Sequence, residues 1–407
     1  MPEPPIIYHD CPNGLRVVAM QRHGAPAGTM GVHVRVGARD EAPHLHGLAH
    51  FVEHTIFKGT SRRRAWHILN RMEAVGGELN AYTTKEETVV YTAFPGGNPA
   101  RAADLVADLV GDSQFPAAQI EKEREVVADE IDSYLDTPAD AVFDDFEDAL
   151  FAGSSIGHNI LGTAESLRTF DTATCRRWLR DYYTPDNMVA FYAGPWSPER
   201  AIAVIERAFA PLTGGRVPLV PTSVPLNAPF DIVRDIASHQ CHTVVGARTC
   251  GLADPAHYTL GLLNNILGGP GMNSLLNVEL RERRGLVYTV EASTGLFSDC
   301  GSVAIYYGCD PEDDARCRRL VAGVIARVAD GSITARALER YKKQYLGQMI
   351  VGSVSLENRI LGIARQTQFR GRALTETEVR AAIRSVTPAA LAACAAALLP
   401  ASTLSLR

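Results

Sequence analysis

The sequence predicts an α+β protein of two homologous domains, each a mainly antiparallel sheet packed against helices. One observation is that segments with strand periodicity and segments with helix periodicity alternate in groups along the 407 residues. Another is a stretch at 211–230 that is rich in Pro, Gly and Ser, which favours an extended linker.

The third observation is that the pattern restarts after this stretch. Residues 245–248 repeat the Val-Gly-Ala-Arg of residues 36–39, and each copy leads through a short loop to a helix that ends in Gly. An internal duplication of about 200 residues explains the repeat. We therefore expect an N-terminal domain at 1–214, a linker at 215–230 and a C-terminal domain at 231–407.

The N-terminal half has a clear pattern of elements. Two apolar runs between Ile6 and Met20 flank Asn13-Gly14, whose positive φ angles suit a tight hairpin turn. From Met30 to Val36, apolar residues alternate with other types, which predicts a half-buried strand. Periodicity and boundary residues then predict a strand pair at 78–94 and helices at 44–57, 64–75, 98–112, 117–134 and 140–152.

Charge and hydropathy exclude several functional classes. Lys and Arg number 40 against 46 Asp and Glu, a net charge of −6, so we expect no nucleic acid and no anionic membrane as partner. The chain has no uncharged apolar run of about 18 residues, and its start, Met1 to Pro5, has no export signal. We expect a cytoplasmic protein, and the Arg- and Ala-rich composition indicates a GC-rich bacterial genome.

The eight cysteines form no C-x-x-C pair. The sequence therefore favours neither a thiolate metal site nor a disulfide framework. We expect reduced thiols, most of them buried.

The segment His50 to His54, His-Phe-Val-Glu-His, is an H-x-x-E-H motif. Residues four apart lie on one face of a helix, so the two imidazoles can converge on one zinc ion with Glu53 beside them. Apolar residues on the opposite side would turn these groups toward a cleft: Leu45, Leu48, Val52 and Ile56. The pentapeptide alone also fits a pair of surface or helix-capping histidines.

A catalytic zinc needs one more ligand from the protein, because it usually takes three and leaves one position to water. The acidic helical segment 121–131 places Glu123 and Glu130 seven residues apart on one face. Either glutamate could reach the metal. Charge-rich helices are also commonly solvated faces with i,i+4 ion pairs, so periodicity leaves both assignments open.

The stretch from Gly47 to Thr60 resembles the signature of the pitrilysin, insulin-degrading enzyme and mitochondrial processing peptidase family of inverted zincins, family M16. In that family the third zinc ligand is a Glu in a context like Glu-Arg-x-Val-x-x-x-Glu-Ile. Glu130 lies 76 positions after His54 and matches both the context and the spacing, so the resemblance assigns it this role. Glu123 matches a second family glutamate, which supports the ligands from outside the coordination sphere.

Two further matches extend the resemblance over both halves. Residues 76–84 resemble the family's Gly-Gly-x-x-Asn-Ala-x-Thr segment, an edge strand that pairs with extended substrate, which assigns Asn80 and Ala81 to substrate binding. Residues 280–288 resemble a segment whose Arg and Tyr, seven apart, bind substrate and stabilise the tetrahedral intermediate, and Arg281 and Tyr288 fit that spacing. Without the resemblance, these two are an ordinary helix-end arginine and a strand tyrosine.

The resemblance implies a zinc metalloendopeptidase with one Zn²⁺ per chain, bound by His50, His54 and Glu130. Zinc would lower the pKa of a bound water and polarise the scissile carbonyl, and Glu53 would act as general base. Arg281 and Tyr288 would stabilise the charge that develops on the carbonyl oxygen.

The resemblance also implies an assembly. Long family members close four such domains around a chamber and this chain has two, which implies a clamshell homodimer in which Arg281 and Tyr288 of one subunit serve the zinc of the other. The expected substrates are peptides or unfolded segments. The main alternative is the catalytic subunit of a heterodimer with an inactive relative that matures a specific precursor.

Two other functional classes remain open. A non-catalytic structural subunit is disfavoured by the intact H-x-x-E-H motif. A small-molecule metallohydrolase is disfavoured by the edge strand Leu79–Thr84, which has no purpose without an extended peptide.

Overall fold

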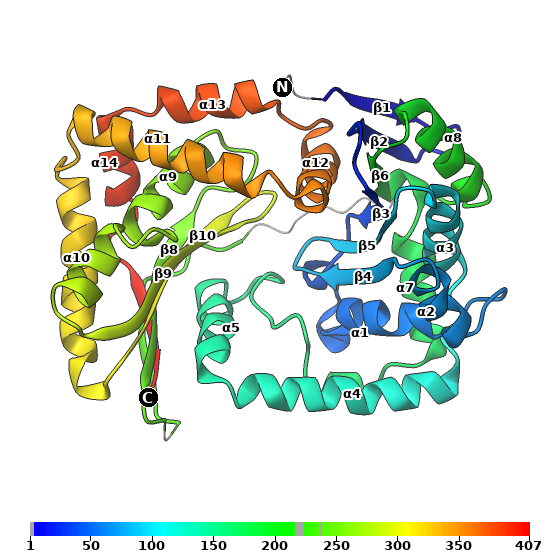
Figure 1. Ribbon diagram of the computed structural model, residues 1–407. Coiled ribbons are helices and arrows are strands. Elements are labelled where there is room, and N and C mark those ends of the chain that lie inside the picture. Colours follow the sequence, from blue (N-terminus) through cyan, green and yellow to red (C-terminus); the bar gives the residue numbers. More distant parts are fainter. Residues whose placement is uncertain (1–3, 216–223, 237) are drawn as a thin grey trace. The chain divides into compact units, whose positions relative to one another are not determined.

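A computed structural model describes residues 4–215, 224–236 and 238–407 of the chain (Figure 1). These residues form two compact units that interleave along the sequence. The first unit comprises Met1–Ile131, His158–Val220 and Gly352–Leu374, and the second comprises Asp132–Gly157, Pro221–Val351 and Thr375–Arg407. The predicted division at 215–230 stays a prediction, and its residues 216–223 lie outside the described residues.

The first unit is built on a six-stranded sheet with the strand order β1-β2-β6-β3-β5-β4. All neighbouring strands are antiparallel except β2 and β6, which are parallel. The predicted hairpin, central strand and strand pair are confirmed, but the central strand is buried on both faces and is not half-buried as predicted. The strands are β1 (Ile6–Asp10), β2 (Arg16–Gln21), β3 (Ala27–Val34), β4 (Glu78–Thr83), β5 (Thr88–Pro95) and β6 (Met188–Gly194).

The second unit is built on a five-stranded sheet that repeats this topology. Its order is β7-β11-β8-β10-β9, again with one parallel pair, β7 and β11, followed by antiparallel neighbours. Strands β7, β11, β8, β10 and β9 therefore correspond to β2, β6, β3, β5 and β4. The strands are β7 (Asp231–Arg234), β8 (Cys241–Thr249), β9 (Val287–Leu296), β10 (Gly301–Cys309) and β11 (Ser402–Leu406).

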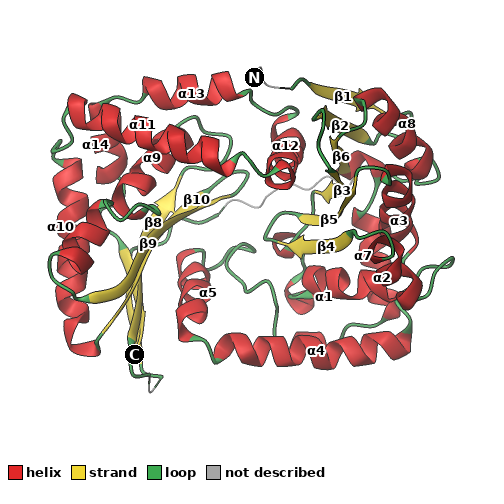
Figure 2. Ribbon diagram, in the orientation of Figure 1, coloured by secondary structure: helices red, strands yellow, loops and turns green. Residues whose placement is uncertain are grey.

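Helices cover both sheets (Figure 2). The first unit holds α1 (Leu48–Thr55), α2 (Ala65–Glu73), α3 (Pro99–Asp112), α6 (Ala164–Leu167), α7 (Thr172–Tyr182), α8 (Pro198–Phe209) and α12 (Leu356–Arg370). The second holds α5 (Pro138–Leu150), α9 (His257–Gly268), α10 (Asp314–Ala329), α13 (Glu376–Ser385) and α14 (Pro388–Ala396). Helices α4 (Ala117–Leu135) and α11 (Ala335–Gly352) lead from one unit into the other.

Each sheet buries one face under a helix from the other half of the sequence. Alternate residues of a strand point to opposite faces, so Val17 packs in one core of the first unit and Val18 in another. The core with Val18 is closed by Ile360 and Ile363 of α12. In the second unit, Phe146 and its neighbours on α5 pack against Val244, Tyr306 and Leu404 of the sheet.

The helix predictions hold with one correction. Helices α2, α3, α4 and α5 match the predicted ranges to within two residues at each end. The range 44–57 is not one helix: α1 spans only Leu48–Thr55, with 3₁₀ turns at Pro43–Leu45 and Ile56–Lys58. Gly47 causes the break, because its φ of 96° is left-handed and cannot continue a right-handed helix. No helix among the described residues is long and apolar enough to cross a bilayer.

Candidate metal centre

Helix α1 carries the H-x-x-E-H motif, and its N-terminus is held firmly in place. A Cβ atom on Gly47 would lie 2.5 Å from the carbonyl oxygen of Leu161, so only glycine fits there. The buried Glu41 carboxyl group accepts hydrogen bonds from the backbone N–H of Gly47 (2.8 Å) and of Ala49 (2.7 Å). An acceptor on these otherwise unpaired donors stabilises the start of the helix.

The apolar side of α1 explains which way the motif faces. Leu48, Phe51 and Val52 are buried in the core of the first unit, between the sheet and the neighbouring helices. His54 and Glu53 are only partly buried. The helix thus anchors one side and presents the polar residues of the motif on another.

The structure brings His50, His54 and Glu130 together. One ligand atom from each lies within 4.8 Å of the others, although Glu130 comes from α4. The two carboxylate oxygens of Glu130 lie 3.7 Å from His50 Nε2 and 3.4 Å from His54 Nε2. The two imidazole centroids are 4.5 Å apart.

This set of donors fits zinc. Two imidazole nitrogens and one carboxylate oxygen form the ligand set of a well-known class of catalytic zinc sites, with a fourth position for water. Burial is the main cause that lowers the pKa of His50 to about 3, and the neighbouring His54 contributes in the same direction. The His50 ring is therefore neutral near pH 7 and its nitrogen lone pair is available to a metal.

Two residues outside this group hold His54 in position. Glu123, also on α4, is buried, and its Oε1 lies 3.1 Å from His54 Nδ1. Its other oxygen pairs with Lys58 Nζ at 2.6 Å. With the proton on Nδ1 donated to Glu123, His54 Nε2 is left free to accept a metal, the arrangement that usually orients a ligating histidine.

Sequence reasoning missed Lys58 and Glu41. Lys58 follows His54 by four residues, so helical spacing was a signal for its contact with the same partner. Glu41 had no such signal, because it caps α1 from a separate turn. The same carboxyl group lies 3.0 Å from His158 Nε2, and the His158 ring stacks on His46 at a centroid distance of 3.6 Å.

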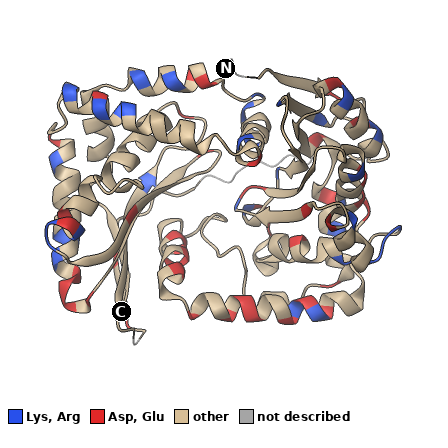
Figure 3. Ribbon diagram, in the orientation of Figure 1, with Lys and Arg blue, Asp and Glu red and all other residues tan. Residues whose placement is uncertain are grey.

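Glu53 lies one helical turn from His50 and next to His54 in the chain. Burial raises the pKa of its carboxyl group, and the charge of Glu130 adds to this rise against the opposing effect of His54. Acidic residues outnumber the basic residues Lys122 and Arg124 along α4, the helix that supplies Glu130 (Figure 3).

Asn80 and Ala81 lie on β4, at the open edge of the first sheet. The N–H of Thr84 donates to the carbonyl of Glu87 at 2.8 Å, so these two residues form a hydrogen-bonded pair at the end of the hairpin. Such pairs alternate along antiparallel strands, so Asn80 also bonds to β5 while the N–H and C=O of Ala81 point toward the open edge.

Arg281 and Tyr288 belong to the second unit, whereas the histidines belong to the first. Arg281 lies on the helical segment Asn277–Glu282 and Tyr288 lies on β9, and both side chains are exposed. The Tyr288 hydroxyl donates to Asp310 Oδ1 at 3.3 Å.

The convergent His, His and Glu donors are those expected of a zinc peptidase, and comparison with known proteins shows the family. The family model described as "Insulinase (Peptidase family M16)" matches residues 16–164. The family model described as "Peptidase M16 inactive domain" matches residues 170–345. The chain belongs to peptidase family M16, in its short bacterial type.

Individual relatives agree with this assignment. An uncharacterized zinc protease of Mycobacterium tuberculosis is 36% identical, over 89% of this chain and 83% of that protein. The beta subunit of the mitochondrial-processing peptidase of Dictyostelium discoideum is 29% identical, over 95% of this chain and 85% of that protein. The crystal structure of a protease from Helicobacter pylori matches with a TM-score of 0.93 over the whole of both chains, and at 18% identity this likeness establishes the fold.

Proposed function

We propose that the protein is a zinc-dependent endopeptidase that hydrolyses peptides or unfolded segments. The observation that carries the proposal is the convergence of His50, His54 and Glu130, with Glu53 on the same helix as the two histidines. These three ligands would hold one zinc ion per chain. Bound zinc would lower the pKa of a water molecule and polarise the scissile carbonyl group.

The residues of the chain would then carry out the proton transfers. Glu53 accepts a proton from the attacking water as the new C–O bond forms, and it later delivers that proton to the leaving amine. Glu123 and Lys58 keep His54 oriented throughout. Arg281 and Tyr288 donate hydrogen bonds to the oxygen on which negative charge develops.

Strand β4 would bind the substrate by strand addition. The outward N–H and C=O of Ala81 can pair with an extended peptide, and Asn80 would contribute through its side chain. Main-chain pairing is nearly independent of sequence, so it suits a general peptidase. It also requires an extended segment, which selects against folded proteins.

The proposed assembly is a clamshell homodimer that encloses a chamber, with Arg281 and Tyr288 of one subunit serving the zinc of its partner. The chain carries both the zinc motif and the Arg/Tyr pair, so a homodimer would be self-sufficient. A heterodimer with an inactive relative is the second candidate, because one relative is named as a subunit of a processing peptidase.

The test compares wild type, Glu53→Gln and His50→Ala for zinc content and for cleavage of a mixed peptide library. Glu53→Gln should keep its zinc and lose turnover by about 100-fold or more, because a general base contributes that much. His50→Ala should lose both zinc and activity. Near-normal cleavage by Glu53→Gln would refute the mechanism, and zinc-bearing but inert wild type would favour the heterodimer.

A further inference from the structure

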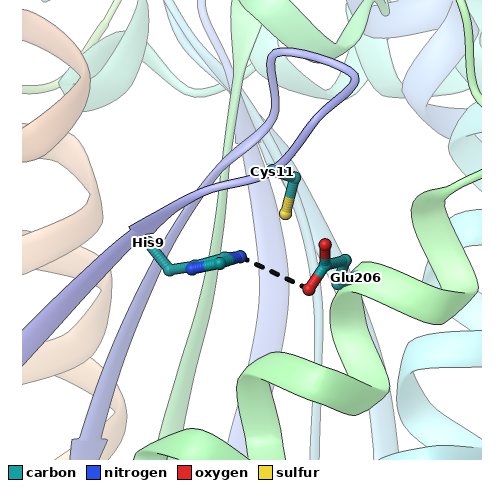
Figure 4. A group of neighbouring side chains, drawn as sticks. All are labelled: His9, Cys11 and Glu206. Carbon is teal, nitrogen blue, oxygen red and sulfur yellow. Dashed lines mark ion pairs between the residues drawn. The ribbon is translucent and has the colours of Figure 1, made fainter.

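A second group of metal-ligating side chains lies in the first unit, outside the candidate peptidase site. It consists of His9 on β1, Cys11 in the turn after β1, and Glu206 on α8. One ligand atom from each lies within 4.8 Å of the others, and His9 Nε2 is 3.3 Å from Glu206 Oε2. Figure 4 shows the three side chains pointing toward one another from the hairpin and the helix.

The backbone that carries these donors is fixed by hydrogen bonds. The turn after β1 is closed by Cys11 N–H to the Leu15 carbonyl at 2.8 Å and by Gly14 N–H to the Cys11 carbonyl at 3.0 Å. The Asn13 amide in the same turn donates to the carbonyls of Phe209 at 3.0 Å and Leu212 at 3.2 Å, just after Glu206. These bonds hold the turn against the end of α8, so the donors are placed by the fold rather than by chance contact of surface side chains.

We propose that His9, Cys11 and Glu206 bind a zinc ion. The sulfur, nitrogen and oxygen donors are the three kinds of ligand that zinc takes in proteins, whereas Mg²⁺ and Ca²⁺ prefer oxygen alone. Cys11 and the Nε2 atom of His9 are buried, while the side chain of Glu206 is 37% exposed, so water can supply the fourth ligand from the side of Glu206.

Charge balance favours occupancy by a divalent cation. A thiolate and a carboxylate together neutralise the two positive charges of zinc, and a neutral imidazole completes the set. Burial, with a smaller contribution from the nearby Glu206, raises the pKa of the Cys11 thiol to about 11, so the metal-free thiol keeps its proton. On binding, the S–H bond breaks, the S–Zn bond forms, and the proton passes to solvent.

The site would have a structural purpose that is separate from peptide hydrolysis. It would clamp the β1–β2 hairpin to α8, which packs on the same sheet. The alternative is an ion pair between His9 and Glu206 beside an inert thiol. Metal stoichiometry separates these two possibilities.

The first experiment is native mass spectrometry with metal analysis on the full chain. Wild type loaded with zinc should hold two ions, His50→Ala one, Cys11→Ser one, and the double variant none. Wild type with a single zinc that is lost completely in His50→Ala would overturn the proposal.

The second experiment uses Co²⁺ as a probe of the metal-free protein. A thiolate ligand produces a sulfur-to-cobalt charge-transfer band, which two histidines and a glutamate cannot produce. The band should appear in wild type and in His50→Ala and vanish in Cys11→Ser. Cys394→Ser is the matched control, because Cys394 is a free, half-buried thiol outside both metal-ligating groups of the described residues, and it should retain the band.

Substitutions at the two partly exposed ligands test the site even if Cys11→Ser does not fold. His9→Gln and Glu206→Gln should weaken Co²⁺ binding at this site at least tenfold while the metal-free proteins melt at the wild-type temperature. A band that persists in Cys11→Ser, or unchanged Co²⁺ affinity in both of these variants, would refute the site.

Discussion

A hydrogen bond to Glu123, which is not itself a ligand, fixes the orientation of the His54 ring. His54 Nδ1 meets Glu123, which in turn meets Lys58, so a chain of three side chains fixes the ring. Glu123 sits in a buried position, where water does not readily replace it as a partner. A loss of this carboxylate should therefore loosen the ring and lower its basicity.

We expect Glu123→Gln to weaken zinc binding about 10- to 100-fold, the usual effect of removing such a partner. Competition with a chelator of known affinity measures it. Glu125→Gln is the control, because Glu125 is an exposed glutamate on the same helix and the substitution removes the same charge. Equal zinc affinities in the two variants would show that Glu123 does not support the site.

The raised pKa of Glu41 predicts that the stability of the folded protein depends on pH. Burial raises the pKa of its carboxyl group from the ordinary 4.5 to about 8, although backbone hydrogen bonds to Ala49 and Gly47 oppose the rise. Between these two pH values the folded chain binds a proton that the unfolded chain has released. The free energy of unfolding therefore falls as pH rises through this window, by at most about 1.4 kcal/mol per pH unit for one group.

Glu41→Gln removes this titration. The stability of wild type relative to the variant should decline from pH 5 to pH 8, as measured by urea unfolding of both proteins in the presence of a chelator. A stability difference that stays constant over this range would mean that the pKa of Glu41 is not raised in the folded protein.

At the scale of elements, β4 is the strand that we propose to bind the substrate. Its backbone alternates between residues that bond to β5 and residues that face the open edge. Proline lacks an N–H and is tolerated on an edge strand where that N–H is not part of the ladder. This alternation allows substrate pairing to be separated from sheet stability.

We expect Ala81→Pro to fold with near-normal thermal stability and to lose at least about tenfold in kcat/KM, because one main-chain bond to the peptide is gone. Asn80→Pro should instead lower the melting temperature, since its N–H bonds to β5. Peptide kinetics and thermal melts of both variants provide the measurement. Full activity in Ala81→Pro would exclude substrate pairing at this position.

Helix α1 shows where local pattern and structure differ. The spacing of the motif correctly placed His50, Glu53 and His54 on one helix. The predicted length was wrong, since Gly47 adopts a left-handed conformation against the backbone of Leu161 and starts the helix later. That contact comes from a distant segment, which periodicity around α1 does not contain.

At the scale of the whole molecule, each half of the sequence completes the core of the other. Helix α12 from the C-terminal half covers the first sheet, and α5 from the N-terminal half covers the second. One face of each sheet is thus covered by a helix from the other half of the sequence. The two halves of the sequence are therefore expected to depend on one another for folding.

The proposed dimer predicts complementation between two inactive variants. Glu53→Gln lacks the general base and Arg281→Ala lacks the partner's arginine, so each homodimer should be inactive. In the mixed dimer, the zinc site with an intact Glu53 receives Arg281 from the other subunit. Unfolding and refolding the variants together should restore about a quarter of wild-type activity, because half of the dimers are mixed and each has one complete site.

The control is the same treatment of each variant alone, which should remain inactive. Absence of rescue in a mixture that native mass spectrometry shows to contain mixed dimers would mean that Arg281 acts within its own chain or not at all in catalysis.

Much of the fold and of the candidate site could be predicted from the sequence. The H-x-x-E-H spacing, the Asn-Gly turn and the alternation of apolar residues depend on neighbours along the chain, and local geometry alone translates them into helix and strand. The second sheet repeats the topology of the first sheet, as an internal duplication predicts. The repeated Val-Gly-Ala-Arg segments are not equivalent, however, because residues 36–39 follow β3 whereas residues 245–248 lie within β8. Glu130 needed the family resemblance, because helical spacing could not separate it from Glu123.

Only the tertiary structure decided which distant residues meet. The eight cysteines, without a C-x-x-C pair, did not favour a thiolate metal site, yet folding places Glu206 beside His9 and Cys11, almost two hundred positions earlier. Folding likewise brings the Glu41 carboxyl group to the start of α1. It also covers the first sheet with α12 and the second sheet with α5. Burial of apolar faces drives these long-range contacts, and a linear pattern shows which faces are apolar but not which partners cover them.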